Sequence, residues 1–209
     1  MTRSALLALA LALAAVPAAQ AQVLRIGIDA VGLSYAETHA ARRANGQGVG
    51  GLVSVRWRRF GLDLSGYTSR VDSVPGELSK FTMLEGRVRA SYRVVPLVAI
   101  EIGGERRKID PALATQDVSA GSIGVLSEAP LTKLGSIWMR GAYLVNPKFS
   151  GGGTAGLAVE LGFGVAVGTA NGRFRVRAEY GFQRIDRTAD NLDVPIQVSV
   201  AKLGVDFGI

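Results

Sequence analysis

Residues 173–183 read RFRVRAEYGFQ, in which apolar and polar side chains alternate. Every second side chain is apolar, from Phe174 to Phe182, whereas most of those between are charged, as Arg175 and Glu179 are. Successive side chains of a β-strand point to opposite faces, so the segment divides into an apolar face and a polar face. A helix repeats about every 3.6 residues and would spread the charges around its axis. The segment therefore predicts an amphipathic strand.

The same alternation recurs along the chain, most clearly over residues 84–94 and 157–167. In the second of these segments, Gly162 and Gly164 fall on the polar side, which predicts a crowded or curved face. Residues 118–127 give the weakest pattern because neither face is clearly apolar. With the weaker cases included, the pattern predicts about ten strands, near residues 23–35, 51–58, 60–68, 82–94, 97–106, 118–127, 134–145, 154–168, 173–184 and 195–209.

The connections between these strands alternate in length. Tight links fall at residues 58–60, 95–96, 128–133 and 169–172, and longer polar ones at 36–50, 69–80, 107–117, 146–153 and 185–194. Bacterial outer-membrane barrels place short turns on the periplasmic side and longer loops outside. The sequence thus predicts an all-β fold, a closed antiparallel up-and-down transmembrane β-barrel of about ten strands, with eight as the alternative count.

The N-terminus has the features of a secretory leader. Met1 to Arg3 carries a positive charge, residues 5–16 are apolar, and Ala19-Gln20-Ala21 supplies a small-x-small cleavage site. The apolar run is shorter than the roughly 20 residues that span a bilayer, which argues against a membrane anchor. We therefore predict a signal peptide at residues 1–21 and a single outer-membrane barrel domain at 22–209. The chain has no cysteine, so a lipid attached through cysteine is excluded.

The last strand carries a family resemblance. Residues 203–209 read LGVDFGI, with alternate apolar residues leading to Phe207. Together with the leader and the strand pattern, this segment resembles the C-terminal strand of small bacterial outer-membrane β-barrel proteins, of the OmpA/OmpX-like or porin-like kind. It departs from their pattern because the final residue is Ile209 rather than an aromatic. The resemblance implies an outer-membrane location and insertion by the general barrel-assembly machinery.

Alternation alone does not say which face is outside. A soluble, lipocalin-like periplasmic barrel would turn the apolar face inward around a ligand. In a membrane barrel the charges must point inward, because each arginine near the lipid midplane costs about 2–4 kcal/mol. We then expect oppositely charged side chains to pair in the lumen. This predicted lumen network comprises Arg25, Asp29, Arg56, Asp63, Glu85, Arg87, Arg89, Glu101, Glu105, Arg140, Glu160, Arg175, Arg177, Glu179 and Asp206.

Aromatic residues gather near the predicted strand ends and favour the membrane alternative. Paired aromatic girdles mark the two interfaces of membrane barrels. The predicted girdle near the short turns contains Trp57, Phe60, Tyr92, Phe174 and Phe207. Toward the long loops it contains Tyr35, Phe81, Tyr143, Tyr180 and Phe182.

The formal charge of +7, from 24 basic and 17 acidic side chains, does not indicate a nucleic-acid partner. Most arginines alternate singly with apolar residues instead of forming one patch, and export removes the protein from cellular nucleic acid. Guanidinium groups bind phosphate well. The expected partners are therefore outer-membrane lipid and lipopolysaccharide, contacted by basic residues in or near the predicted outer loops: Arg42, Arg43, Arg106, Arg107 and Lys108.

No group of residues clearly indicates catalysis, a metal or a cofactor. His39 is the single histidine and lies in the first predicted loop, where an orienting partner is not evident. Asp186, Asp190 and Asp193 lack the alternating oxygen ligands of a calcium loop. The glycines at 151–153 lack the Lys-Ser/Thr of a phosphate-binding loop. We expect solvated loops at all three places.

These observations predict a non-enzymatic barrel with a structural or surface-interaction role and at most a narrow pore. About ten strands enclose little more space than eight, and long basic side chains would fill much of it. A positive excess near the short turns would favour leakage of small anions. The alternatives are an outer-membrane hydrolase with a site at the outer rim that uses His39, and the soluble ligand-binding barrel.

Overall fold

The computed structural model describes residues 22–37, 42–73, 80–111, 117–169 and 172–209. The predicted signal peptide and His39 lie outside these ranges, so both stay predictions. In the part of the chain that is described, no helix is both long enough and apolar enough to cross a membrane.

The described residues form ten long strands and one strand of two residues, β10. The long strands contain 13 to 16 residues each. Their bounds are β1 Gln22–Glu37, β2 Arg42–Trp57, β3 Phe60–Ser73, β4 Phe81–Val95, β5 Val98–Asp110, β6 Val118–Pro130, β7 Gly135–Phe149, β8 Thr154–Gly168, β9 Phe174–Ala189, β10 Leu192–Asp193 and β11 Ile196–Gly208.

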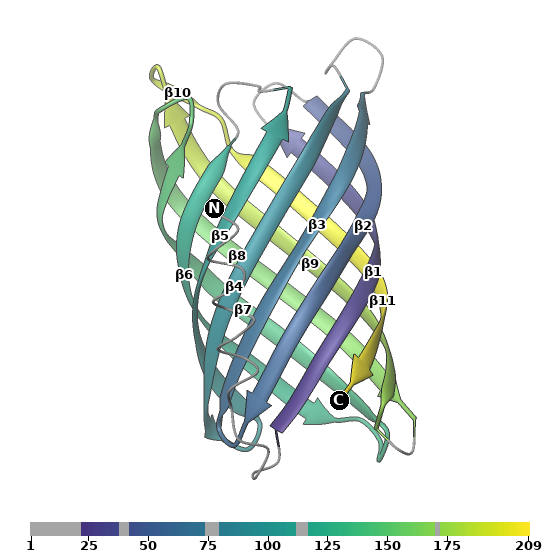
Figure 1. The fold of residues 1–209 in the computed structure, drawn as a ribbon. Coiled ribbons are helices and arrows are strands. Elements are labelled where there is room, and N and C mark those ends of the chain that lie inside the picture. Colours follow the sequence, from purple (N-terminus) through teal and green to yellow (C-terminus); the bar gives the residue numbers. More distant parts are fainter. Residues whose placement is uncertain (1–21, 38–41, 74–79, 112–116, 170–171) are drawn as a thin grey trace, which may run out of the picture.

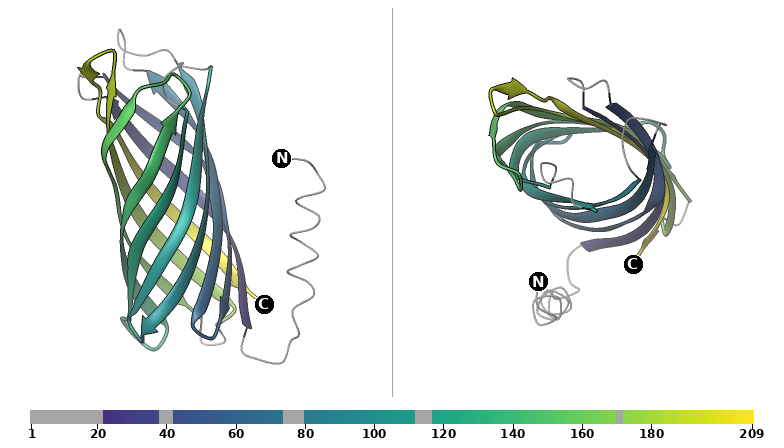
Figure 2. Two further views of the ribbon diagram at one scale, coloured as in Figure 1. Left: turned by 90° about the vertical axis from the view of Figure 1, so that its left-hand side faces the viewer. Right: turned by 90° about the horizontal axis from the view of Figure 1, so that it is seen from above.

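The long strands close into one antiparallel ring (Figures 1 and 2). Each of the strands from β1 to β9 pairs with the next in sequence, and β11 joins β9 to β1. The first and last strands pair from Arg25 opposite Gly208 to Glu37 opposite Ile196, so the start of β1 and the end of β11 lie at the end that carries the short turns. The small β10 only extends the edge of β9, where Leu192 pairs with Ala189. The predicted closed, up-and-down barrel of ten strands is confirmed.

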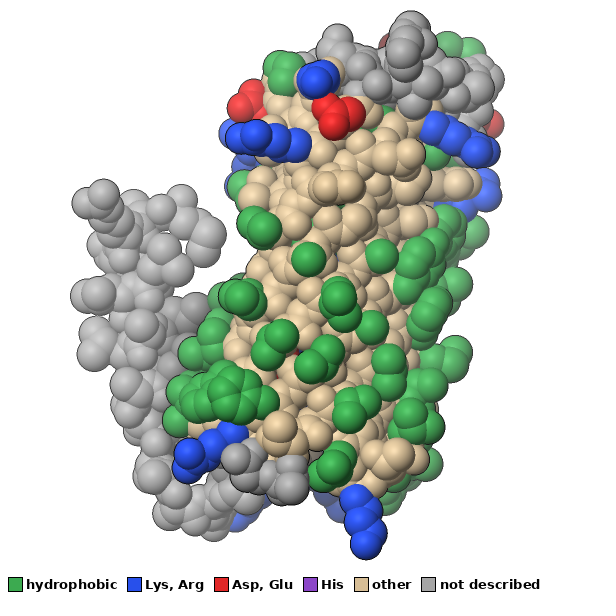
Figure 3. Space-filling model, turned by 90° about the vertical axis from the view of Figure 1, so that its right-hand side faces the viewer, with side chains coloured by type: hydrophobic (Ala, Val, Ile, Leu, Met, Phe, Trp, Pro, Cys, Tyr) green, Lys and Arg blue, Asp and Glu red, His purple; other side chains and the backbone are tan. Residues whose placement is uncertain are grey.

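The apolar face of the alternating strands points outward. On β9, Phe174 and Val176 are 51% and 54% exposed, whereas Arg177, the next residue along the strand, is 5% exposed. Figure 3 shows hydrophobic side chains spread over the lower and middle outer wall. We call this surface the apolar belt; it includes Ile26, Ile28, Leu62, Leu64, Val88, Ile100, Ile102, Ile123, Val125, Ile137, Met139, Leu161, Phe163, Val176, Leu203 and Val205.

Polarity reverses toward the loop end of the barrel. There the outward positions of β3 are Thr68 and Arg70, and charged side chains gather at this end in Figure 3. The inward positions are apolar instead. They form a buried cluster inside the upper barrel, here called the upper core: Val31, Leu33, Tyr35, Ala44, Tyr67, Val71, Phe81, Met83, Ile109, Ile196, Val198 and Val200.

This reversal explains why the predicted loops are too long. Residues 42–50 and 69–73, predicted as loop, continue β2 and β3, and β5, β7 and β9 likewise run on to Asp110, Phe149 and Ala189. The ladder continues because the backbone pairing does not depend on which face is apolar, as the pairing of Gly46 with Val71 shows. The alternation with apolar residues outside holds only in the lower barrel and ends where the polarity reverses, but the strands themselves continue.

The strand with the weakest sequence pattern, β6, is present in the structure. Ile123 and Val125 point outward and are about half exposed, while Val118, Ala120 and Leu126 are buried on the inner face. Both faces of β6 carry apolar side chains, so its sequence does not separate into two kinds of residue. Its alternation is therefore hard to see in the sequence, although its ladder to β5 is regular.

Candidate functional site: the charged lumen

A layer of ion pairs crosses the middle of the barrel. Arg87 of β4 contacts Glu160 of β8 through Nη1 and Oε1 at 3.0 Å, and its Nε lies 2.6 Å from Glu85 Oε1. Arg107 of β5 donates from Nε to Glu85 Oε2 at 3.0 Å and also hydrogen-bonds Gln183 of β9. Since β4 and β8 lie on opposite sides of the ring, these contacts bridge the lumen instead of lining it.

Further hydrogen bonds tie this layer together. Gln183 Nε2 donates to Glu105 Oε1 at 2.6 Å, and Tyr67 donates to Glu85 Oε2 at 3.1 Å. Arg89 Nη2 reaches the same Glu160 oxygen as Arg87, at 2.6 Å. Glu85 and Arg107 are each 1% exposed, and of the other residues in this layer only Arg87 is more than 8% exposed, so the layer is largely buried. We call the residues Glu85, Arg87, Arg89, Glu105, Arg107, Glu160 and Gln183 the closing layer.

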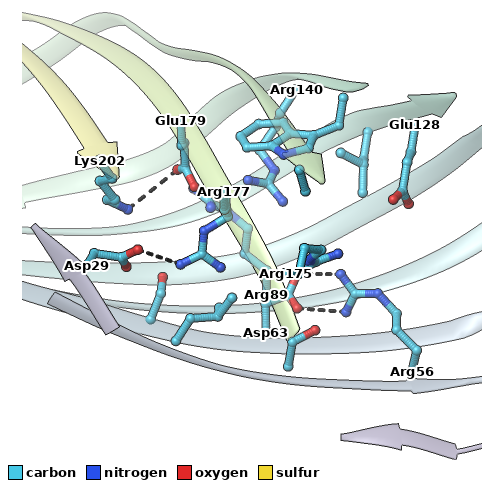
Figure 4. Close-up of a pocket in the computed structure, with 16 residues that line it drawn as sticks. Asp29, Arg56, Asp63, Arg89, Glu128, Arg140, Arg175, Arg177, Glu179 and Lys202 are labelled. Carbon is cyan, nitrogen blue, oxygen red and sulfur yellow. Dashed lines mark hydrogen bonds and ion pairs between the residues drawn. The ribbon is translucent and has the colours of Figure 1, made fainter. Parts of the chain in front are cut away.

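A second set of pairs lies nearer the short turns (Figure 4). Arg177 bridges two carboxylates, with Nη2 2.6 Å from Asp29 Oδ1 and Nη1 2.9 Å from Asp206 Oδ1. Arg175 donates to the second oxygen of Asp206 at 2.7 Å. Lys202 lies 3.4 Å from Glu179. These pairs link β1, β9 and β11 across the seam where the chain closes on itself.

Two bidentate pairs complete this set. Arg56 Nη1 and Nη2 donate to the two Asp63 oxygens at 2.6 and 3.0 Å. Arg140 also binds Glu101 through two bonds, with Nε donating to Oε2 at 2.5 Å and Nη2 donating to Oε1 at 3.0 Å. Paired, parallel bonds of this kind fix the planes of both groups and are stronger than single neutral bonds.

The structure therefore brings thirteen of the fifteen predicted lumen residues into ion pairs with one another, and a fourteenth, Glu179, pairs with Lys202. The fifteenth, Arg25, points inward at the short-turn end, where its Nη2 donates to the backbone carbonyl of Gly172 at 3.2 Å. It belongs to the mouth of the lumen and contacts none of the acids in the network through a described bond.

The free space inside the barrel is small. Below the closing layer, a cavity of about 90 Å³ is lined by residues that include Asp29, Arg89 and Arg177. Beside the layer, a second space of about 10 Å³ is lined by Arg87, Gln183 and others. Volumes of this size hold a few water molecules, and not a solute.

Trp138 is a lumen residue that the sequence analysis missed. It lines the lower cavity, and the Arg140 guanidinium lies 5.2 Å from its ring centroid. A Cβ at Gly164 would come within 2.5 Å of Trp138, so only glycine leaves room for the ring. The sequence contained a signal for this position. Trp138 is two residues from Arg140 and so lies on the same face of the strand, and Gly164 was already predicted to lie on a crowded face. Gln183 was missed as a partner for a different reason: its contact with Glu105 joins strands that are distant in sequence. Tyr67 lies opposite Glu85 on the neighbouring strand, and it was missed because the predicted network contained only charged side chains.

The aromatic residues near the short turns form two clusters on the outer wall. Trp57 stacks on Phe60 at a centroid separation of 6.0 Å, and Phe60 contacts Tyr92 at 5.0 Å. Phe174 and Phe207 meet at 5.2 Å across the β9–β11 pair. All five are at least 41% exposed on the outer wall.

The aromatic band toward the loops is less complete than predicted. Tyr143 and Tyr180 are 48% and 39% exposed on the outer wall, and Phe182 is partly exposed on the same face. The prediction for Tyr35 and Phe81 was wrong. Both are buried in the upper core, where their rings meet edge to face at 5.7 Å, because inward positions are the apolar ones at this height.

The predicted basic outer-loop group is also corrected. Arg106 and Lys108 are exposed on the outer wall of β5, and Arg43 is exposed on β2, so these residues lie on strands and not in loops. Arg107 points into the barrel and belongs to the closing layer. The error follows from the predicted end of the strand at residue 106, since a residue inside a strand points to the side opposite its neighbours.

The acidic residues near residue 190 serve local structure. Asp186 accepts from Arg184 Nε at 2.8 Å, and Asp193 accepts from the Thr188 hydroxyl at 2.8 Å. Gly152 and Gly153 have positive φ angles in the preceding β7–β8 turn, where the Gly152 carbonyl accepts from Arg187. Across the described ranges, no group of three or more acidic or histidine side chains has a geometry suited to a metal ion.

Comparisons with known proteins find solved structures that resemble the chain at low sequence identity. No protein-family model matches the sequence, and no curated protein matches it. Among solved structures, Neisserial surface protein A matches with a TM-score of 0.44 and 11% identity, over 88% of this chain and 96% of that one. The KdgM porin matches with a TM-score of 0.41 and 11% identity, over 87% and 98%. Outer-membrane expressed OmpT of Vibrio cholerae matches with a TM-score of 0.37 and 12% identity, over 80% and 60%.

Proposed function

We propose that this protein is a non-enzymatic integral outer-membrane barrel with a structural or surface-interaction role and a lumen closed to solutes. The observation that carries the proposal is the apolar belt. Side chains such as Ile28, Ile102 and Leu203 are 60–74% exposed around a closed ring, which would be costly in water and is suited to lipid. A soluble, lipocalin-like barrel requires the opposite orientation.

The height of the belt supports this proposal. On β9 the outward positions stay apolar from Phe174 to Phe182 and become polar at Arg184. Eight residue steps of about 3.3 Å on a strand tilted by about 40° give a band roughly 20 Å tall, near the roughly 25 Å of outer-membrane barrels. The upper barrel, with its polar wall and its own core, then stands in the aqueous phase outside the membrane.

Cell fractionation tests the location. The protein should be recovered with outer membranes, resist extraction without detergent, and migrate differently on gels before and after heating. Recovery in the periplasmic fraction without detergent would instead support the soluble ligand-binding barrel. Cross-linking to the barrel-assembly machinery during biogenesis should be detectable, and should weaken when Phe207 of the closing strand is replaced by serine.

The closing layer supports the absence of a solute pathway, since Arg87 and Arg107 reach across the lumen to the buried Glu160 and Gln183. Planar bilayers containing the purified protein should show no stepwise conductance. Reproducible single-channel steps would contradict the closed lumen and favour a narrow pore.

Anionic lipid is the proposed partner of the outer wall. Arg106, Ser119 and Lys148 form one row across β5, β6 and β7, since Arg106 pairs with Ser119 and Ser119 with Lys148. The next row toward the membrane contains Gly104 and Gly121, which leave a hollow in the wall of the apolar belt. A lipid phosphate could bind the two cations while an acyl chain occupies this hollow.

A charge-removal variant tests this contact. We expect R106Q/K148Q to retain less co-purified lipopolysaccharide than the parent protein, with unchanged folding. The matched control R58Q/R59Q removes two charges at the opposite end. An equal loss from both variants, or no loss from either, would reject a specific contact at the upper row.

The absence of enzymatic activity is part of the proposal, and His39 provides its test. A H39A variant should leave the lipid A acylation pattern and the surface protease profile unchanged. A change in either would favour the outer-rim hydrolase.

A further inference from the structure

The mouth of the barrel at the short-turn end holds a cavity of about 570 Å³. We call it the basic vestibule. Its wall includes one acidic side chain, Glu128, against seven basic ones: Arg25, Arg56, Arg58, Arg59, Arg93, Lys133 and Arg175. The loop end of the barrel has a different character, because the upper core fills it with apolar side chains.

The acids within reach neutralise only part of this charge. Arg93 pairs with Glu128 at 3.1 Å, Arg56 with Asp63 and Arg175 with Asp206. Of the remaining basic residues of the vestibule, Arg25, Arg59 and Lys133 have no acidic partner within the described ion pairs. An excess of about three positive charges therefore converges on one concave space, where low-dielectric walls strengthen its attraction for an anion.

The vestibule leads inward to a closed end. It shares Arg56, Glu128, Arg175 and three other wall residues with the cavity of about 90 Å³ above it. In that cavity each of the six lining basic side chains is paired with an acid, and beyond it Arg87 and Glu160 cross the lumen. An anion drawn into the mouth meets no further excess of positive charge and no passage. The space has the form of a binding site and not of a conduction path.

We propose that the basic vestibule binds a small, soluble, multivalent oxyanion, with clustered phosphate or carboxylate groups. Several guanidinium groups at one mouth suit such a ligand, because each binds an oxyanion through two parallel hydrogen bonds. The volume admits a molecule with several such groups, while the closed inner end excludes threading of a polymer. The proposal concerns the barrel in any environment and does not depend on its membrane location.

Calorimetric titration of the full barrel in zwitterionic detergent tests the site, with tripolyphosphate as the probe. The parent protein should bind tripolyphosphate saturably with one site per chain and should not bind acetate at equal ionic strength. The variant R59Q/R93Q/K133Q should lose affinity at least about tenfold, as expected from the loss of charge-assisted contacts. The double variant R59Q/K133Q keeps the Arg93–Glu128 pair and should also weaken binding.

The matched control R70Q/K80Q/K108Q removes three exposed positive charges near the loop end. It should bind tripolyphosphate within about twofold of the parent, since distant exposed charges are largely screened by salt. Heat-modifiable mobility confirms that each variant is folded. Equal weakening in the vestibule and control variants would show non-specific attraction and overturn the proposal, as would absence of saturable binding to the parent protein.

Discussion

Arg107 illustrates what a charge inside this barrel requires. Its side chain is 1% exposed, and it is held by Glu85 and Gln183 from strands on either side of the lumen. A buried ion pair adds little net stability by itself, because desolvation offsets the attraction between its charges. Removing one partner is far more costly, since the other charge then stays buried without compensation.

We therefore expect R107M to lower the free energy of unfolding by about 3–5 kcal/mol. The double variant E85Q/R107M should recover part of the loss, because it also removes the buried Glu85 charge, which R107M leaves with Arg87 as its remaining ion-pair partner. Urea unfolding in lipid vesicles measures both effects. Arg106, the exposed neighbour, is the control, and R106M should change stability by less than about 0.5 kcal/mol. Equal losses for R107M and R106M would contradict the buried layer.

Gly164 makes a prediction about crowding inside the barrel. A methyl group there would overlap the Trp138 ring, so G164A should displace the ring and cost about 1–3 kcal/mol. In a W57F background Trp138 is the remaining tryptophan, and its emission spectrum should shift. Gly86 has nothing within 4 Å of a built Cβ, and G86A should leave both the spectrum and the stability unchanged. An unshifted spectrum for G164A would show that the ring packs elsewhere.

At the scale of the strand, each element has two segments of opposite polarity. On β3, Leu62 and Leu64 point outward near the short turns, whereas Thr68 and Arg70 occupy the same face near the loops. Alternation in the lower segment could be predicted because lipid-type burial separates the two faces cleanly. The upper segment could not, because its apolar residues point inward and its small polar residues resemble a loop.

The upper core should contribute stability even though it lies beyond the apolar belt. Ile109 is 1% exposed in this core, so I109A should lower the free energy of unfolding by about 2–5 kcal/mol. Ile28 is 74% exposed on the outer wall, and I28A should cost less than about 1 kcal/mol in vesicles, since lipid fills the space. Equal losses would indicate that the two isoleucines occupy similar surroundings.

At the scale of the molecule, the ring and the orientation of its charges follow from the sequence, but the closure of the lumen does not. Each ion pair between neighbouring strands, such as Arg175–Asp206, lies on faces that the alternation identifies. Contacts such as Arg87–Glu160 depend on which strands stand opposite each other, and hence on the strand count and stagger of the closed barrel. Local pattern does not contain this information.

The membrane interface should divide the barrel into a lipid-facing lower part and a water-facing upper part. The chain has no cysteine, so single cysteines at Ile102 and Thr68 can be labelled with a fluorophore without interference. In vesicles, fluorescence from position 102 should be quenched by brominated lipid and shielded from aqueous iodide, and position 68 should show the reverse. Equal quenching by iodide at the two positions would contradict the account.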